Sequence, residues 1–111
     1  MKIKKDKVIA EGTRFSVEVK GKEVARAFLY ILRNDLHDNP FGLLEDLFVD
    51  EHLRGQGAGT ALVKTVIEEA RANGCYKLIA GSRYARERVH RLYEKLGFQK
   101  HGIEFRLNLS N

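Results

Sequence analysis

Residues 53–62 read LRGQGAGTAL, and the fold of this chain is most easily worked out from this stretch. Gly55, Gly57 and Gly59 stand at alternate positions just before a run of helical character. A glycine inside a helix costs roughly 1 kcal/mol relative to alanine, so three in five residues disfavour the helix start. Glycine also leaves the backbone amides uncovered and allows turns that other residues disfavour. Because the first amides of a helix attract anions, the pattern predicts a phosphate-binding loop.

Two other phosphate-binding loops do not fit this stretch. A P-loop needs Lys followed by Ser or Thr at a fixed spacing after the glycines, and no such pair occurs here. The dinucleotide fingerprint counted from Gly55 needs glycine at position 60, where the chain has Thr60. The remaining alternative is that the glycines only shape a turn.

The sequence around the loop predicts an α+β fold with a mixed central sheet. Alternating residues such as Phe15, Val17 and Val19 indicate a half-buried strand, and a short turn at Gly21 leads into a second, antiparallel one. A strand, helix and strand in succession on either side of the loop make the flanking strands parallel. We therefore expect one domain over residues 1–111, with N-terminal antiparallel strands followed by a β-α-β-α-β order. The expected strands are 13–20, 24–33, 42–50, 76–80 and 98–109, and the expected helices are 58–73, capped by Gly74, and Ser82 to Gly97.

The charge balance favours an anionic partner. Lys and Arg number 20 against 15 Asp and Glu, which gives a net charge of +5. This excess is spread along the chain except for the basic residues between Arg83 and Lys95 and the N-terminal lysines, and no stack of aromatic side chains is interleaved with those charges. We therefore expect an anionic small molecule rather than nucleic acid.

Compartment and metal binding can also be addressed from composition. No apolar run is long enough to span a membrane, and the Lys-rich start lacks the apolar middle of a signal peptide. The only cysteine, Cys75, cannot form an internal disulfide, so we expect a cytoplasmic protein. His37 with Asp35 and Asp38 could suggest a metal site, but an exposed turn is the favoured interpretation and no metal is expected.

Two motifs together resemble one protein family. Residues 54–59, RGQGAG, match the [Q/R]-x-x-G-x-[G/A] pattern of the GNAT superfamily of acyl-CoA-dependent N-acyltransferases. Residues 43–63 resemble that family's central strand, loop and helix, and RERVHRLYEKLGF at 86–98 resembles its later helix-to-strand segment. The similarity covers about residues 42–106. It implies a GNAT-like fold and a direct transfer of acetyl from acetyl-CoA to a primary amine, without metal.

The resemblance also implies which residues bind the donor. The loop amides would hold the pyrophosphate of acetyl-CoA, and the backbone of the preceding strand would bond its pantetheine arm and supply an N–H to the oxyanion. Arg86 would contact a CoA phosphate or belong to a solvated face. The residues assigned to the donor are Leu47, Phe48, Val49, Arg54, Gly55, Gln56, Gly57, Ala58, Gly59, Thr60 and Arg86.

Three residues are candidates for moving protons. Tyr93 occupies the position of the family's usual general acid, and its alternative is an ordinary core tyrosine. On a helical wheel Tyr93 lies at the edge of the apolar stripe, which favours a phenol reaching a polar cleft. Glu45 or Asp46 would accept the amine proton, directly or through water, and Glu45 is preferred by its resemblance to polyamine acetyltransferases. Adjacent residues on a strand face opposite sides, so only one of these carboxylates faces the acceptor unless a bulge intervenes; a simple ion pair with a neighbouring Arg or Lys is the alternative.

The acceptor site is where the resemblance ends. Relatives usually carry one or two helices between their first two strands, and this chain has no such helical period before residue 57. The acceptor pocket is therefore expected to be open or completed by a second subunit in a homodimer. A small amine, a polyamine or a protein amine fits equally well. A non-catalytic acyl-CoA-binding module is the alternative function, and a basic nucleic-acid-binding domain is a third.

Overall fold

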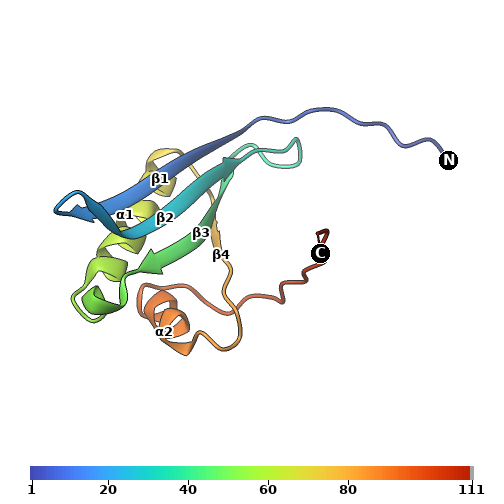
Figure 1. Cartoon of the computed structure of the whole chain (residues 1–111). Coiled ribbons are helices and arrows are strands. Elements are labelled where there is room, and N and C mark those ends of the chain that lie inside the picture. Colours follow the sequence, from blue (N-terminus) through green and yellow to red (C-terminus); the bar gives the residue numbers. More distant parts are fainter. Residues whose placement is uncertain (111) are drawn as a thin grey trace. The chain divides into compact units, whose positions relative to one another are not determined.

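The computed structural model describes residues 1–110. The chain divides into two compact units, Met1–Ala80 and Gly81–Asn111. The first unit is a four-stranded sheet with one long helix, and the second contains one short helix (Figure 1). Each unit is described by itself.

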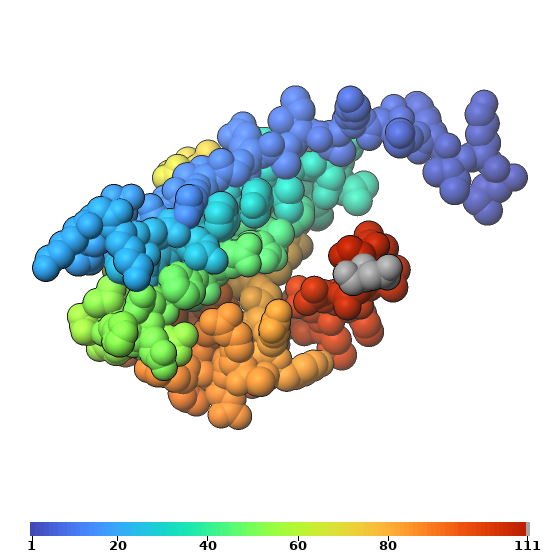
Figure 2. Space-filling view, in the orientation of Figure 1, coloured from blue at the N-terminus to red at the C-terminus, as the bar shows by residue number. Residues whose placement is uncertain are grey.

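The sheet of the first unit has the strand order β1-β2-β3-β4. The first three strands pair antiparallel, and β4 pairs parallel to β3, as the strand, helix and strand order predicted. Figure 2 shows the three long strands lying side by side, from blue to green. The strands are β1 (Ala10–Val19), β2 (Lys22–Leu32), β3 (Phe41–Val49) and β4 (Leu78–Ala80), and the helix between the last two is α1 (Ala58–Ala72).

A two-residue turn joins β1 to β2. Val19 pairs with Lys22, so Lys20 and Gly21 form the whole loop. Both have positive φ, 54° and 78°, which is the backbone conformation of the hairpin turn whose twist matches that of the strands. The turn therefore sets the register of the pairs next to it, and an irregularity between Val17 and Glu18 shifts the register for the rest of the hairpin.

The core of the first unit lies between the sheet and α1. Leu29 of β2 and Leu44 of β3 are 1% exposed, and Val63 and Val66 of α1 are fully buried. Gly42 of β3 leaves room for side chains of the neighbouring strands, because a Cβ at this position would lie 2.9 Å from Leu78 Cδ1 and 3.2 Å from Leu29 Cδ1. The periodicities of 2 in the strands and 3.6 in the helix thus meet in one apolar layer.

The opposite face of the sheet is more open. On β2 the residues that alternate with the buried ones are half-buried or exposed, namely Arg26, Phe28 and Tyr30. In the described part of the first unit, the only long helix is α1, which packs on the other face (Figure 1). This second face therefore carries aromatic and charged side chains that are within reach of solvent.

The second unit departs from the sequence prediction in two ways. Its helix α2 spans Glu87–Lys95, so it begins five residues after the predicted Ser82. The residues before it form a turn instead, in which the N–H of Arg86 donates to the carbonyl of Arg83 (3.1 Å). At the other end, Gly97 with φ of 101° ends the helix as predicted.

The predicted last strand, 98–109, is wrong for the described residues. No strand and no helix is assigned over residues 98–110. Ile103, Phe105, Leu107 and Leu109 alternate as predicted but are 70–91% exposed. Alternation identifies a segment able to pair, but a strand forms only where a partner edge accepts its hydrogen bonds.

Candidate functional site

The glycine loop is tied to the end of β3. A short 3-10 helix, Glu51–Leu53, follows β3, and the Asp50 side chain accepts a hydrogen bond from the His52 N–H at 3.0 Å. Arg54 Nε donates back to the carbonyl of Val49 at 3.4 Å, and Gln56 Nε2 donates to the carbonyl of His52 at 3.2 Å. Side-chain contacts within the loop therefore fix its path from the sheet to the helix.

Two of the three glycines are required by the backbone conformation. Gly55 and Gly57 have φ of 85° and 86°, and a Cβ at either would meet no atom within 4 Å. Strain in the left-handed region, rather than crowding, therefore explains these two glycines. Gly59 differs, because it lies in the first turn of α1 and is not among the residues of positive φ.

The start of α1 suits an anion. Gly57 is the N-cap, so no side chain caps the helix, and the first turn contains no acidic residue. The first amides of a helix have no partner inside the helix, and the dipole adds positive charge at the same end. The predicted loop residues from Arg54 to Thr60 therefore surround a helix end at which an anionic group is favoured.

A β-bulge lies in the middle of β3. Phe28 of β2 pairs with Glu45, and Arg26 pairs with Phe48, so Asp46 and Leu47 together oppose one residue of β2. Asp46 has φ of 51°, which is rare for a residue other than glycine. The rule that adjacent strand residues face opposite sides therefore does not hold strictly for Glu45 and Asp46, because Asp46 lies in a bulge.

The bulge changes which side chains share a face. Leu44 and Leu47 are both buried although they are three residues apart, while Glu45 is half-buried and Asp46 is exposed. Glu45 lies on the face opposite α1, with its cross-strand partner Phe28. The bulge therefore lets Asp46 lie beside Glu45 without being turned into the core.

The strand residues predicted to bond the donor continue from this bulge. Leu47 is buried, Phe48 is 37% exposed and Val49 is half-buried. A bulge locally disrupts the ladder of hydrogen bonds. This short run therefore connects the candidate carboxylates directly to the loop.

A charged cluster that the sequence did not single out lies on the same face. Glu23 pairs with Arg14 across the hairpin and with Arg26 on its own strand, where Arg26 Nη1 lies 3.7 Å from Glu23 Oε2. The signal available in the sequence was the polar side of the two alternating strands. Without the register, however, nothing indicated that these three side chains meet.

Tyr93 is the one buried residue of α2, at 7% exposure. Its ring packs against Phe98 with 5.1 Å between the centroids, and the Phe98 N–H donates to the Tyr93 carbonyl at 3.0 Å. The helical wheel placed Tyr93 at the edge of the apolar stripe, but Val89 and Leu92 are less buried than it is. The phenol is therefore held in a defined position.

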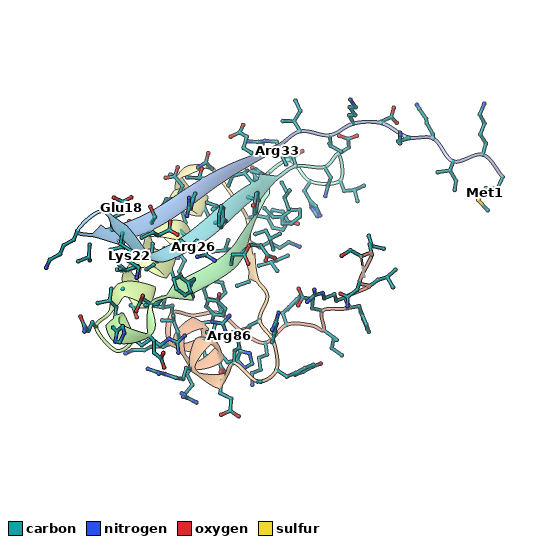
Figure 3. The ribbon with its side chains drawn as sticks, viewed as in Figure 1. Met1, Glu18, Lys22, Arg26, Arg33 and Arg86 are labelled. Atoms are coloured by element: carbon teal, nitrogen blue, oxygen red, sulfur yellow. The ribbon has the colours of Figure 1, made fainter. Side chains whose placement is uncertain are left out.

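Two neighbouring residues have simpler surroundings. Arg86 is exposed at the N-cap of α2, where Figure 3 labels it. The His90 ring nitrogen Nε2 lies 2.9 Å from the carbonyl of Arg83; because a carbonyl only accepts, Nε2 donates. His90 therefore ties α2 to the turn before it.

Three further features of the described residues concern metal binding, the turn at His37 and membrane spans. Among residues 1–110 no three His, Cys, Asp or Glu side chains gather where they could hold a metal ion. The His37 turn borders a shallow pocket of about 220 Å³, and its ring packs on Tyr76 at 4.9 Å. Neither helix of the described chain is long and apolar enough to cross a membrane.

Comparisons with known proteins identify the family of this chain. The sequence profile of the acetyltransferase (GNAT) family matches residues 3–98. Glucosamine 6-phosphate N-acetyltransferase of Trypanosoma brucei brucei is 44% identical over 68 residues, which are 61% of this chain and 44% of the relative. N-acetylaspartate synthetase of Danio rerio is 39% identical over 59 residues, which are 53% of this chain and 21% of the relative.

A solved acetyltransferase of Trypanosoma brucei superimposes with a TM-score of 0.78 and 36% identity over 90% of this chain and 69% of that one. This confirms the predicted fold class. The chain spans less than half the length of the two curated relatives named above.

Proposed function

Because the chain belongs to the GNAT acetyltransferase family, we propose that it transfers the acetyl group of acetyl-CoA to a primary amine. The observation that carries this proposal is the glycine loop, which presents an uncapped helix end with no acidic residue in its first turn. Residues 1–111 would act as one functional domain.

The donor would be held by backbone groups. The amides from Arg54 to Thr60 would bind the pyrophosphate, since glycine leaves them uncovered and the helix dipole favours negative charge. The backbone of Leu47, Phe48 and Val49 would bond the pantetheine arm. Arg86 is the side chain proposed for a further CoA phosphate.

The reaction would proceed by direct attack. The amine nitrogen bonds to the thioester carbonyl carbon, the carbonyl oxygen becomes negative, and the carbon–sulfur bond then breaks to release the CoA thiolate. A backbone N–H beside the β3 bulge would stabilise the oxyanion, an effect worth about 3 kcal/mol in other enzymes. Tyr93 would protonate the departing thiolate.

The amine must lose a proton before it attacks. A primary amine titrates near 10.4, so keeping it neutral at pH 7 costs about 4.6 kcal/mol. Glu45 is the proposed acceptor of this proton, directly or through a water molecule, because it lies half-buried on the open face of the sheet. Asp46, exposed in the bulge, is the second candidate.

The names of the relatives suggest which amine to test first. Glucosamine 6-phosphate and aspartate, to which two of those names refer, are both amines that carry an anionic group. We therefore propose an anionic amine, with an amino sugar phosphate as the first choice. A second subunit would complete the acceptor pocket.

The test is a direct assay. The purified chain is mixed with acetyl-CoA and glucosamine 6-phosphate, aspartate, a polyamine or a lysine peptide, and released thiol is followed with the acetylated product identified by mass. Turnover with at least one amine is expected. Saturable CoA binding without transfer to any amine would instead identify a non-catalytic acyl-CoA-binding module.

A further inference from the structure

A row of side chains crosses three strands on the open face of the sheet. Arg14 of β1 pairs with Phe28 of β2, and Phe28 pairs with Glu45 of β3. Residues directly opposite on neighbouring strands share a face, with about 5 Å between them. Arg14 and Glu45 are therefore about 10 Å apart along this row, a separation that one small molecule can span.

A second arginine joins the row from the next position on that face. Arg26 lies two residues from Phe28 on β2, next to β3 (Figure 3), and it pairs with Phe48. Glu23 holds both arginines: Arg14 Nη2 donates to Glu23 Oε1, and Arg26 Nη1 lies 3.7 Å from Glu23 Oε2. Glu23 therefore offsets only one of the two arginine charges.

Aromatic rings fix the two guanidinium groups. The Arg26 guanidinium carbon lies 4.9 Å from the centroid of the Phe48 ring, and that of Arg14 lies 5.8 Å from the Phe28 ring. A guanidinium has five N–H donors, and one carboxylate uses only some of them. Both side chains remain partly accessible, at 53% for Arg14 and 34% for Arg26, so the other donors can reach a ligand.

Two stacked aromatic rings, Phe28 and Tyr30, lie beside the arginines. The rings of Phe28 and Tyr30 are parallel within 5°, with 6.3 Å between centroids. Gly12 of β1 makes room for the second ring, since a Cβ there would lie 2.9 Å from Tyr30 Cε1. The face thus combines a pair of aromatic rings, two arginines and the carboxylates of Glu23 and Glu45.

We propose that Arg14 and Arg26 bind the anionic group, a phosphate or carboxylate, of the amine whose nitrogen lies at Glu45. Fixed guanidinium groups bind such anions through charge-assisted hydrogen bonds. The inference rests on the proposed function, because it places the acceptor amine at Glu45. Beyond the proposed function, the inference names Arg14 and Arg26 as the residues that select anionic amines over amines without an anionic group.

The experiment compares two ligands that differ only in the anion. Affinities of the full chain for glucosamine 6-phosphate and for glucosamine are measured by titration calorimetry, with coenzyme A present. We expect Arg26→Gln to weaken glucosamine 6-phosphate binding about 10- to 100-fold and to leave glucosamine unchanged. Arg14→Gln, at a more exposed position, is expected to act in the same direction. Arg71→Gln makes the same charge change on the exposed side of α1 and is the control.

Each outcome decides the matter. Equal wild-type affinity for the two amines, or binding of neither, overturns the proposal, as does an equal loss for both amines in Arg26→Gln. A loss of coenzyme A affinity in Arg26→Gln, with the amines unaffected, would assign the arginines to the donor instead. If the wild-type chain prefers the phosphorylated amine but releases no thiol in the assay, the proposed function fails and the anion site stands.

Discussion

The two units of this chain differ in how they bury apolar side chains. Eleven of the twelve buried apolar residues of the described chain lie in Met1–Ala80, and Tyr93 alone lies in the other unit. The first unit pairs its strands with one another and covers one face with α1. The second has a nine-residue helix followed by a segment without helix or strand, whose apolar residues are mostly exposed. Stability is therefore concentrated in one region, whereas the proposed chemistry depends on both.

The largest expected effect tests whether the second unit contributes to catalysis. Tyr93→Phe keeps the ring that packs on Phe98 but removes the hydroxyl that would protonate the thiolate. We expect kcat to fall about 10²–10⁴-fold while the unfolding midpoint changes little. Steady-state kinetics with acetyl-CoA checks this. Tyr84→Phe, at an 87% exposed position in the same unit, is the control, and unchanged turnover in Tyr93→Phe would remove the assignment.

The next effect tests where the stability lies. Leu44→Ala removes a side chain that is 1% exposed in the core of the first unit, and leaves a cavity between β3 and α1. We expect a loss of about 2–5 kcal/mol in the free energy of unfolding, measured with urea. Leu107→Ala makes the same change at an 82% exposed position, where a loss of less than about 0.5 kcal/mol is expected. Equal losses would contradict the contrast between the units.

A smaller effect tests the donor loop. Gly57→Asp places a carboxylate at the N-cap of α1, where its charge repels a pyrophosphate, and the φ of 86° at this position strains the new residue. We expect the Kd for coenzyme A to rise about tenfold or more, with helix content unchanged by circular dichroism. The control is Gly74→Asp, because Gly74 also has positive φ, 75°, and lies just beyond the other end of the same helix. If both variants bind coenzyme A as the wild type does, the loop is not the pyrophosphate site.

The smallest effect concerns the one thiol. Burial raises the pKa of the Cys75 thiol, and the Arg33 guanidinium partly opposes this. A higher pKa leaves less thiolate at pH 8, so alkylation by iodoacetamide is expected to be severalfold slower than for a free thiol. Arg33→Gln removes the opposing charge and should slow the reaction further, as followed by mass spectrometry over time. Faster alkylation in Arg33→Gln would show that the charge does not act on this thiol.

Local patterns in the sequence predicted the first unit well. Turn residues at Gly21, alternation along β1 and β2 and the apolar stripe of α1 are properties of neighbouring residues. The predicted bounds of these three elements differ from the observed bounds by at most three residues. The same reasoning failed for 98–109, because alternation there describes a segment but not a partner for it.

Of the candidate site, the sequence determined the place of the glycine loop and the conformation of two of its glycines. Gly55 and Gly57 were singled out because bare amides and left-handed turns are local needs, and the backbone has both glycines in that conformation. Tertiary structure decided the rest. The bulge that contains Asp46 and leaves it exposed arises from how β3 pairs with β2. The meeting of Arg14, Glu23 and Arg26 likewise depends on strand register, because it brings residues together that are far apart along the chain.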